Sequence, residues 1–124
     1  MRPAVSPNAI IHDDKYTAEL SGQIGMNFES GKLEDGIEKQ TERTIENVKK
    51  ILDGLGWNLQ NIIKIRIYLT DMKNYVVVNE VYSKHFKSDF PARAVTSVIG
   101  LPAGALIEMD CTASGNKIKE LEAE

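Results

Sequence analysis

The chain has 124 residues, of which 42% are hydrophobic and 27% are charged, a composition typical of one ordinary globular domain. Its formal net charge of −3 argues against a broad nucleic-acid-binding surface, because such surfaces neutralise phosphates with Lys and Arg. The single cysteine, Cys111, excludes an internal disulfide and a cysteine-rich zinc site, and no run of about 18 apolar residues is present to span a membrane. The first residues, Met1–Ile10, lack the apolar stretch of a secretory signal, so we expect a cytoplasmic protein.

The N-terminal segment carries a strand pattern. Tyr16, Ala18 and Leu20 alternate along one side of the chain, and the two aspartates before them favour a turn. We therefore expect a short hairpin in which Ala9–His12 pairs with Lys15–Ser21, followed by a loop near residues 26–31.

A long helix pattern follows that loop. Near its start the chain is acidic, with Glu34 and Asp35, and Gly54 and Gly56 can end it, as helix dipole and C-cap preferences require. The helix is expected to begin near Leu33, because apolar or small side chains then recur every three or four residues, at Ile37, Thr41, Ile45, Val48, Ile51, Leu52 and Leu55.

A strand and a second helix come next. Ile62–Thr70 alternates between apolar and polar residues, with Ile63, Ile65, Ile67 and Leu69 on the side expected to face the core. Asp71 can then cap a helix over about Lys73–Phe86. Intrinsic propensity would place the Val76–Val78 run in a strand, but the helical spacing outweighs it; the residues with that spacing are Tyr75, Val78, Val81, Tyr82, His85 and Phe86.

The remaining elements complete an α+β pattern. We expect strands over Ala92–Ile99 and Ala105–Ala113, separated by a turn at Pro102–Gly104. Strands and helices in this order predict a two-layer α+β sandwich with two helices on one face of the sheet. Since Ala92–Ile99 has apolar or small residues on both sides, we expect self-association to cover the second face. Residues 1–124 form one domain, and 115–124 are expected to be a polar tail, frayed or folded as a short surface helix.

Several short motifs resemble those of the Rid family, also called the YjgF family, over about Ser21 to Ala113. They are Ser21-Gly22-Gln23-Ile24, the helix segment from Gln40 to Leu52, Tyr68-Leu69-Thr70-Asp71-Met72, Val78-Asn79-Glu80-Val81-Tyr82, Phe90-Pro91-Ala92-Arg93-Ala94-Val95, Leu101-Pro102 and Ile107-Glu108-Met109.

The resemblance implies a chorismate-mutase-like fold with a mixed sheet and a homotrimer whose sheets line a central barrel. It implies ligand sites in clefts between subunits, hydrolysis of reactive 2-imino acids to 2-keto acids and ammonia, and no metal or organic cofactor. We thus expect a small carboxylate-bearing substrate, with no membrane partner and no nucleic acid.

The resemblance also suggests roles for individual residues. Arg93 stands where the family arginine binds the substrate carboxylate, and Glu108 where the family glutamate positions a water. Gly22 and Asn79 fall on positions that line the cleft, and the backbone of the Arg93 strand, with Ala94 and Val95, completes it. The chain departs from the family at two positions: Asn8 replaces the tyrosine of an N-terminal Gly-Pro-Tyr motif, and Val95 replaces a frequent cysteine.

Residue chemistry alone leaves alternatives open. The planar fork of Arg93 can bind a carboxylate through two hydrogen bonds, or can form a surface or intersubunit salt bridge. Glu108 points away from the helix-covered core, where it can direct a water or pair with Lys64 or Arg66 across the sheet. Gly22 allows a close approach of backbone to ligand, or a plain turn or bulge.

The other candidates have structural alternatives as well. Asn79 can bond a ligand or the surroundings of Glu108 across a subunit contact, and Asn8 can supply a polar contact or lie on a mobile terminus. His12 and His85 show no metal-ligand spacing, and we expect Cys111 to be a small buried hydrophobe. The alternatives to an imine hydrolase are a non-catalytic module that binds keto acids and, less favoured by the acidic charge, an endoribonuclease.

Overall fold

The computed structural model describes residues 7–119, so Ser6, which stands at the glycine position of the Gly-Pro-Tyr motif, and the last five residues of the tail lie outside the described part. Short 3-10 turns at Leu59–Asn61, Met72–Asn74 and Pro102–Gly104 join the main elements. In chain order these are β1 (Tyr16–Ile24), β2 (Met26–Asn27), β3 (Lys32–Leu33), α1 (Gly36–Gly54), β4 (Ile62–Leu69), α2 (Tyr75–His85), β5 (Ala92–Ser97) and β6 (Ile107–Gly115).

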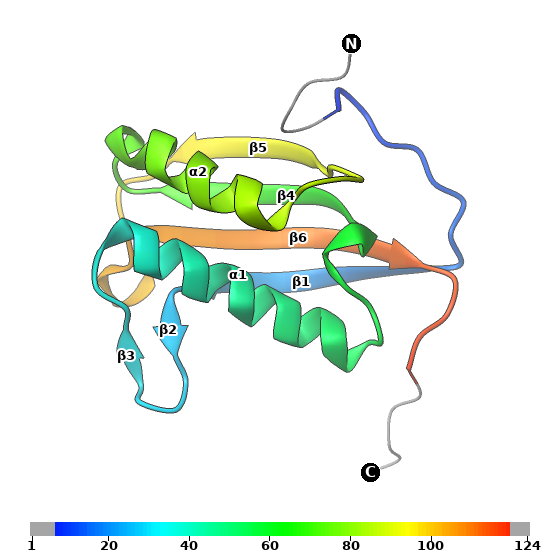
Figure 1. Cartoon of the computed structure of the whole chain (residues 1–124), viewed down its shortest axis with the longest axis horizontal. Coiled ribbons are helices and arrows are strands. Elements are labelled where there is room, and N and C mark those ends of the chain that lie inside the picture. The colour runs from blue at the N-terminus through cyan, green and yellow to red at the C-terminus, as the bar shows by residue number, and fades with distance from the viewer. Residues whose placement is uncertain (1–6, 120–124) are drawn as a thin grey trace.

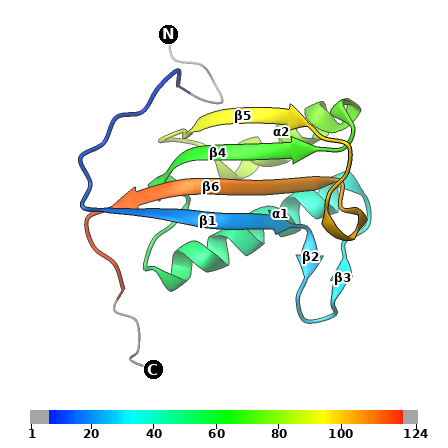
Figure 2. The same ribbon diagram turned by 180° about the vertical axis from the view of Figure 1, so that it is seen from behind.

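The main sheet has four strands in the order β1-β6-β4-β5. β6 runs antiparallel to both of its neighbours, whereas β5 runs parallel to β4, so the sheet is mixed. Helices α1 and α2 lie side by side across one face (Figure 1), and the view from behind shows the other face without a helix (Figure 2). The expected two-layer α+β fold with two helices on one face is confirmed.

The core fills the space between the helices and the sheet. It is built from aliphatic residues of β4 and β6 packed against those of the two helices. The Val76–Val78 run is helical, as its spacing predicted: burying Val78, Val81 and Tyr82 on one side of α2 outweighs the strand preference of the valines. The helix was predicted to start at about Lys73, but α2 begins at Tyr75. Asp71 instead caps the 3-10 turn Met72–Asn74, where its side chain accepts a hydrogen bond from the Lys73 amide.

The predicted N-terminal hairpin is wrong. Residues 9–12 form no strand, and β1 pairs with β6 instead, from Tyr16 opposite Gly115 to Ile24 opposite Glu108. Asp14 explains the difference, because its carboxylate accepts hydrogen bonds from Ser114 and Asn116 at the end of β6 rather than closing a local turn.

One predicted boundary and one predicted core-facing residue were wrong for backbone reasons. α1 begins at Gly36 and not near Leu33, because Leu33 belongs to β3 and Gly36 has a φ of 79°, which residues with a side chain rarely adopt. In β4 the register shifts between Ile62 and Lys64, so Ile62 is buried where Ile63 was expected to be.

The C-terminal boundary also differs from the prediction. β6 continues to Gly115, and the chain after it is held: the Trp57 indole N–H donates to the Lys117 carbonyl at 2.6 Å, and the Lys119 amide to the Leu55 carbonyl at 2.8 Å. The expected polar tail is therefore ordered at least as far as Lys119, although 120–124 lie outside the described residues.

The face of the sheet opposite the helices is polar along β1, β4 and β6 and carries small exposed residues, Ala94 and Thr96, along β5; self-association through it stays a prediction. Arg66 donates to Asp110 at 2.7 Å, and Tyr68 donates to the same carboxylate at 3.0 Å. Thr112 extends this network by donating to Glu19 at 2.7 Å. The hydrogen bond to Asp110 raises the pKa of Tyr68, so its hydroxyl stays protonated as the donor. Any partner on this face would therefore meet a hydrogen-bonded surface.

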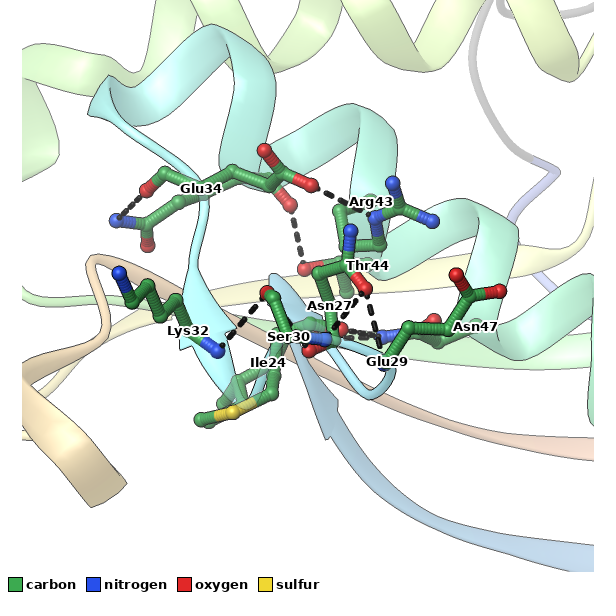
Figure 3. Close-up of polar contacts among 11 residues, drawn as sticks. Ile24, Asn27, Glu29, Ser30, Lys32, Glu34, Arg43, Thr44 and Asn47 are labelled. Atoms are coloured by element: carbon green, nitrogen blue, oxygen red, sulfur yellow. Dashed lines mark hydrogen bonds and ion pairs between the residues drawn. The ribbon is translucent and has the colours of Figure 1, made fainter.

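Buried amides of α1 anchor the end of β1. The Asn47 side chain donates to the carbonyls of Ile24 and Met26, both at 3.0 Å. Figure 3 shows it reaching from the helix toward the chain between β1 and β2. Gln40 donates to the Glu34 carbonyl at 3.0 Å and accepts from the Leu106 amide at 2.9 Å. These bonds fix the end of β1 and the start of β6 relative to the helix layer.

Gly25 allows this close approach, and its substitution gives a test of the packing. A Cβ there would lie 2.6 Å from backbone atoms of Gln40, which cannot swing aside. We expect Gly25→Ala to lower the free energy of unfolding by about 1–3 kcal/mol, measured by urea denaturation. Gly100→Ala is the matched control, since an added Cβ there would have nothing within 4 Å, and it should be neutral or slightly stabilising.

Candidate functional site

Arg93 lies on the edge strand β5 and reaches over α2. Its Nη1 donates to Asn79 Oδ1 at 2.7 Å, and its Nη2 donates to the Tyr75 hydroxyl at 3.2 Å. The guanidinium carbon also lies 4.9 Å from the centroid of the Tyr82 ring. Arg93 is half-buried, and these contacts hold its positively charged guanidinium at a defined place at the β5 edge of the sheet.

Glu108 lies near the start of β6, half-buried, opposite Tyr68 of β4 and Ile24 of β1. Its carboxylate is next to Gly22: a Cβ at that glycine would lie 2.8 Å from Glu108 Cδ. Gly22 sits in the register break of β1 between Leu20 and Gln23, so it is a bulge position that also leaves room for the glutamate. The salt bridge considered for Glu108 is made by its neighbour, because Arg66 pairs with Asp110.

Arg93 and Glu108 point to opposite faces of the sheet. Arg93 is in register with Ile65, a fully buried residue on the helix side, and Glu108 is in register with Tyr68 on the open side. Paired residues in a sheet share a face and successive residues alternate. One copy of the chain therefore brings together Arg93 with Asn79 and, separately, Glu108 with Gly22.

The other candidate residues are more dispersed. Ala94 is exposed on the open face, and Val95 packs against the core from the same side as Arg93. Asn8 is exposed, in a segment without helix or strand. Two residues later, Ile10 lines a hollow of about 490 Å³ that Phe90, just before β5, also lines. The N-terminal segment thus passes the beginning of the Arg93 strand.

Reasoning from the sequence missed the role of α2 beside Arg93. Tyr75 and Tyr82 share the helical spacing of Val78 and Val81, which predicts that all four lie on the buried side of the helix. Tyr82 is buried as expected, but Tyr75 is 37% exposed and bonds Arg93. The spacing of Tyr75, Asn79 and Tyr82 at intervals of four and three places them on one side of a helix, and this was the available signal.

His85 links the two helices. Its ring nitrogens contact Glu42 at 2.5 Å and Lys49 at 3.1 Å. Within residues 7–119 no group of three or more His, Cys, Asp or Glu side chains could hold a metal ion. Nor is any helix of that part long and apolar enough to cross a bilayer.

These features define a small α+β protein whose best candidate site is the guanidinium of Arg93, held in place at one edge of the sheet. The model of the family described as Endoribonuclease L-PSP, which is the YjgF/RidA family, matches residues 5–114. The chain belongs to this family, as its motifs indicated.

Named relatives agree with that assignment. Human 2-iminobutanoate/2-iminopropanoate deaminase is 39% identical over 98 residues, covering 78% of this chain and 72% of the relative. The structure of RidA from the Antarctic bacterium Psychrobacter sp. PAMC 21119 has a TM-score of 0.77 at 30% identity, covering 91% of this chain and 99% of that one. E. coli TdcF, solved with bound serine, has a TM-score of 0.78 at 27% identity, covering 91% of this chain and 95% of its own.

The burial of Cys111 gives a test of its structural role. The thiol is 1% exposed, and burial raises its pKa to about 12, so it is not a nucleophile at neutral pH. We expect an aromatic disulfide reagent to label the folded protein only slowly and to label it completely after unfolding in urea, followed by absorbance. Rapid labelling of the folded protein at neutral pH would contradict this placement.

Proposed function

We propose that the protein hydrolyses reactive 2-imino acids of the 2-iminobutanoate and 2-iminopropanoate type to 2-keto acids and ammonia. The observation that carries the proposal is the position of Arg93, whose guanidinium donates two hydrogen bonds within residues 7–119 and has further N–H donors that can bind a carboxylate. The relatives support the same class of activity, since several are named as imine deaminases.

A complete site under this proposal needs two copies of the chain. Arg93 and Glu108 lie on opposite faces of one sheet, so they can act on one substrate only if a neighbouring copy supplies one of them. We infer a homotrimer in which each site lies in a cleft between subunits, with Arg93 from one copy and Glu108 with Gly22 from the next. The backbone of Ala94 and Val95 and the side chain of Asn8 are the further contacts in this proposal.

The proposed reaction follows from these groups. Arg93 binds the substrate carboxylate, and Glu108 orients a water toward the imine carbon and accepts one of its protons. The water oxygen forms a bond to that carbon, and the imine nitrogen takes up protons. The carbon–nitrogen bond then breaks, ammonia leaves, and the remaining hydroxyl proton is released as the keto group forms.

A non-catalytic module that binds keto acids is the second candidate. Asn8 and Val95, where the family carries tyrosine and frequently cysteine, favour it, since both are residues without an acid–base or nucleophilic group. Stabilisation by 2-oxobutanoate in a thermal melt without any faster imine hydrolysis would support this candidate.

The direct test follows ammonia release from imines generated in place by an amino-acid oxidase. The wild type should accelerate release over buffer, and Arg93→Met and Glu108→Gln should each lower kcat/KM by roughly 10²-fold or more. A wild type no faster than buffer would refute the proposed activity.

Mixing the two inactive variants tests whether the site is shared. When Arg93→Met and Glu108→Gln chains are unfolded together and refolded, about a quarter of the sites combine an intact arginine with an intact glutamate from different copies. We expect a corresponding recovery of activity, with each variant refolded alone as the control. No recovery in mixed trimers would mean that each site is built within one chain.

Gly22→Ala tests the position of Glu108. The added methyl would contact the end of the Glu108 side chain, which can swing away, so the melting temperature should change little. The displaced carboxylate should instead lower kcat with a smaller effect on KM. Gly54→Ala, where an added Cβ would have nothing within 4 Å, is the control and should leave kcat unchanged.

A further inference from the structure

Three side chains of α2 surround the guanidinium of Arg93. Asn79 and Tyr75 accept one hydrogen bond each, at 2.7 and 3.2 Å. The Tyr82 ring lies under the cation, with its centroid 4.9 Å from the guanidinium carbon, and the Tyr75 ring lies 5.9 Å away. All three residues come from one side of one helix, so they form a single rigid support.

This support is neutral. Its contacts are an amide oxygen, a phenol oxygen and aromatic faces, and among the ion pairs of residues 7–119 none involves Arg93. A carboxylate in the same place would neutralise the cation and compete with an anionic ligand. An arginine held only by neutral groups keeps its charge and its remaining N–H donors available.

Tyr82 acts on the cation through its ring and not through its hydroxyl. The residue is 1% exposed, and its hydroxyl has no hydrogen-bond partner among the described residues. Burial raises the pKa of this phenol, so it stays neutral. The ring is itself fixed from below, since Phe86 stacks on it with centroids 4.1 Å apart and planes 12° from parallel. Aromatic faces attract cations within about 6 Å of the centroid.

We propose that Tyr82, Tyr75 and Asn79 are positioning residues that hold the Arg93 fork in the orientation for binding a carboxylate. The proposal rests on the proposed function in that it takes Arg93 to be the anchor of the substrate. It assigns Asn79 to the arginine rather than to direct contact with the ligand. The residues act through Arg93, so their loss should weaken binding of every ligand that carries a carboxylate.

The test separates KM from kcat. Tyr75→Phe removes one acceptor, Asn79→Ala removes the other, and Tyr82→Leu removes the aromatic face while keeping an apolar side chain. We expect each to raise KM for the imine, and Kd for the inert keto acid 2-oxobutanoate by calorimetry, roughly three- to thirtyfold, with a smaller change in kcat. Tyr82→Phe, which restores a ring face, should recover most of the loss caused by Tyr82→Leu.

The chain offers a matched control for loss of a cation–ring contact. Lys15 Nζ lies 5.2 Å from the centroid of the Tyr16 ring on β1, the strand at the opposite edge of the sheet from β5. Tyr16→Leu should leave KM and Kd unchanged. If Tyr82→Leu does not fold, as its melting temperature would show, the exposed Tyr75 and half-buried Asn79 carry the same test.

An activity-independent readout keeps this proposal distinct from the proposed function. The Arg93 Nε–Hε group in the ligand-free protein should have a high NMR order parameter that falls in the Tyr75 and Asn79 variants but not in Tyr16→Leu. A wild type without imine turnover would refute the proposed reaction. The order parameter and the Kd for 2-oxobutanoate would still show whether Tyr82, Tyr75 and Asn79 position Arg93. Unchanged order parameters together with unchanged Kd in the variants would overturn it.

Discussion

The alternation of side chains along β-strands is the constraint on which the candidate site depends. Successive residues point to opposite faces, and a register fixed by hydrogen bonds carries that assignment across the sheet. Arg93 shares a face with buried Ile65, and Glu108 shares the other with Tyr68. The two groups with the most suitable chemistry are therefore separated by the sheet itself. If both groups act on one substrate, as we propose, a neighbouring copy has to supply one of them.

Helix α2 connects the core to the candidate site. One side of it buries Val78 and Val81 against the sheet, and the next side supports Arg93 through Asn79 and Tyr75. Tyr82 belongs to both, because its ring is enclosed by the core yet forms the floor beneath the cation. Packing that stabilises the fold thus also fixes the orientation of the guanidinium, at the cost of a phenol hydroxyl left without a partner among the described residues.

The elements with strong periodicity could be predicted from the sequence, and those decided by distant contacts could not. α1, β4 and α2 follow from apolar spacing, and the motif around Arg93 identified the family that the family model confirms. The hairpin failed because Asp14 bonds Ser114 and Asn116, which lie about a hundred positions later in the chain and leave no local signal. The prediction that Ile63 faces the core failed for a similar reason, because the register shift after Ile62 depends on the partner strand.

For the site, residue type was informative and placement was not. Arginine and glutamate could be chosen for their chemistry, but the faces they occupy follow from the pairing of β5 with β4 and of β6 with both of its neighbours. The two departures from the family motif can also be interpreted only in three dimensions. Val95 packs against the core and Asn8 is exposed before the first strand, and neither is among the groups that hold Arg93. The contacts that hold Arg93 therefore involve neither of these two positions, which under the proposed function contribute separate contacts to the same site.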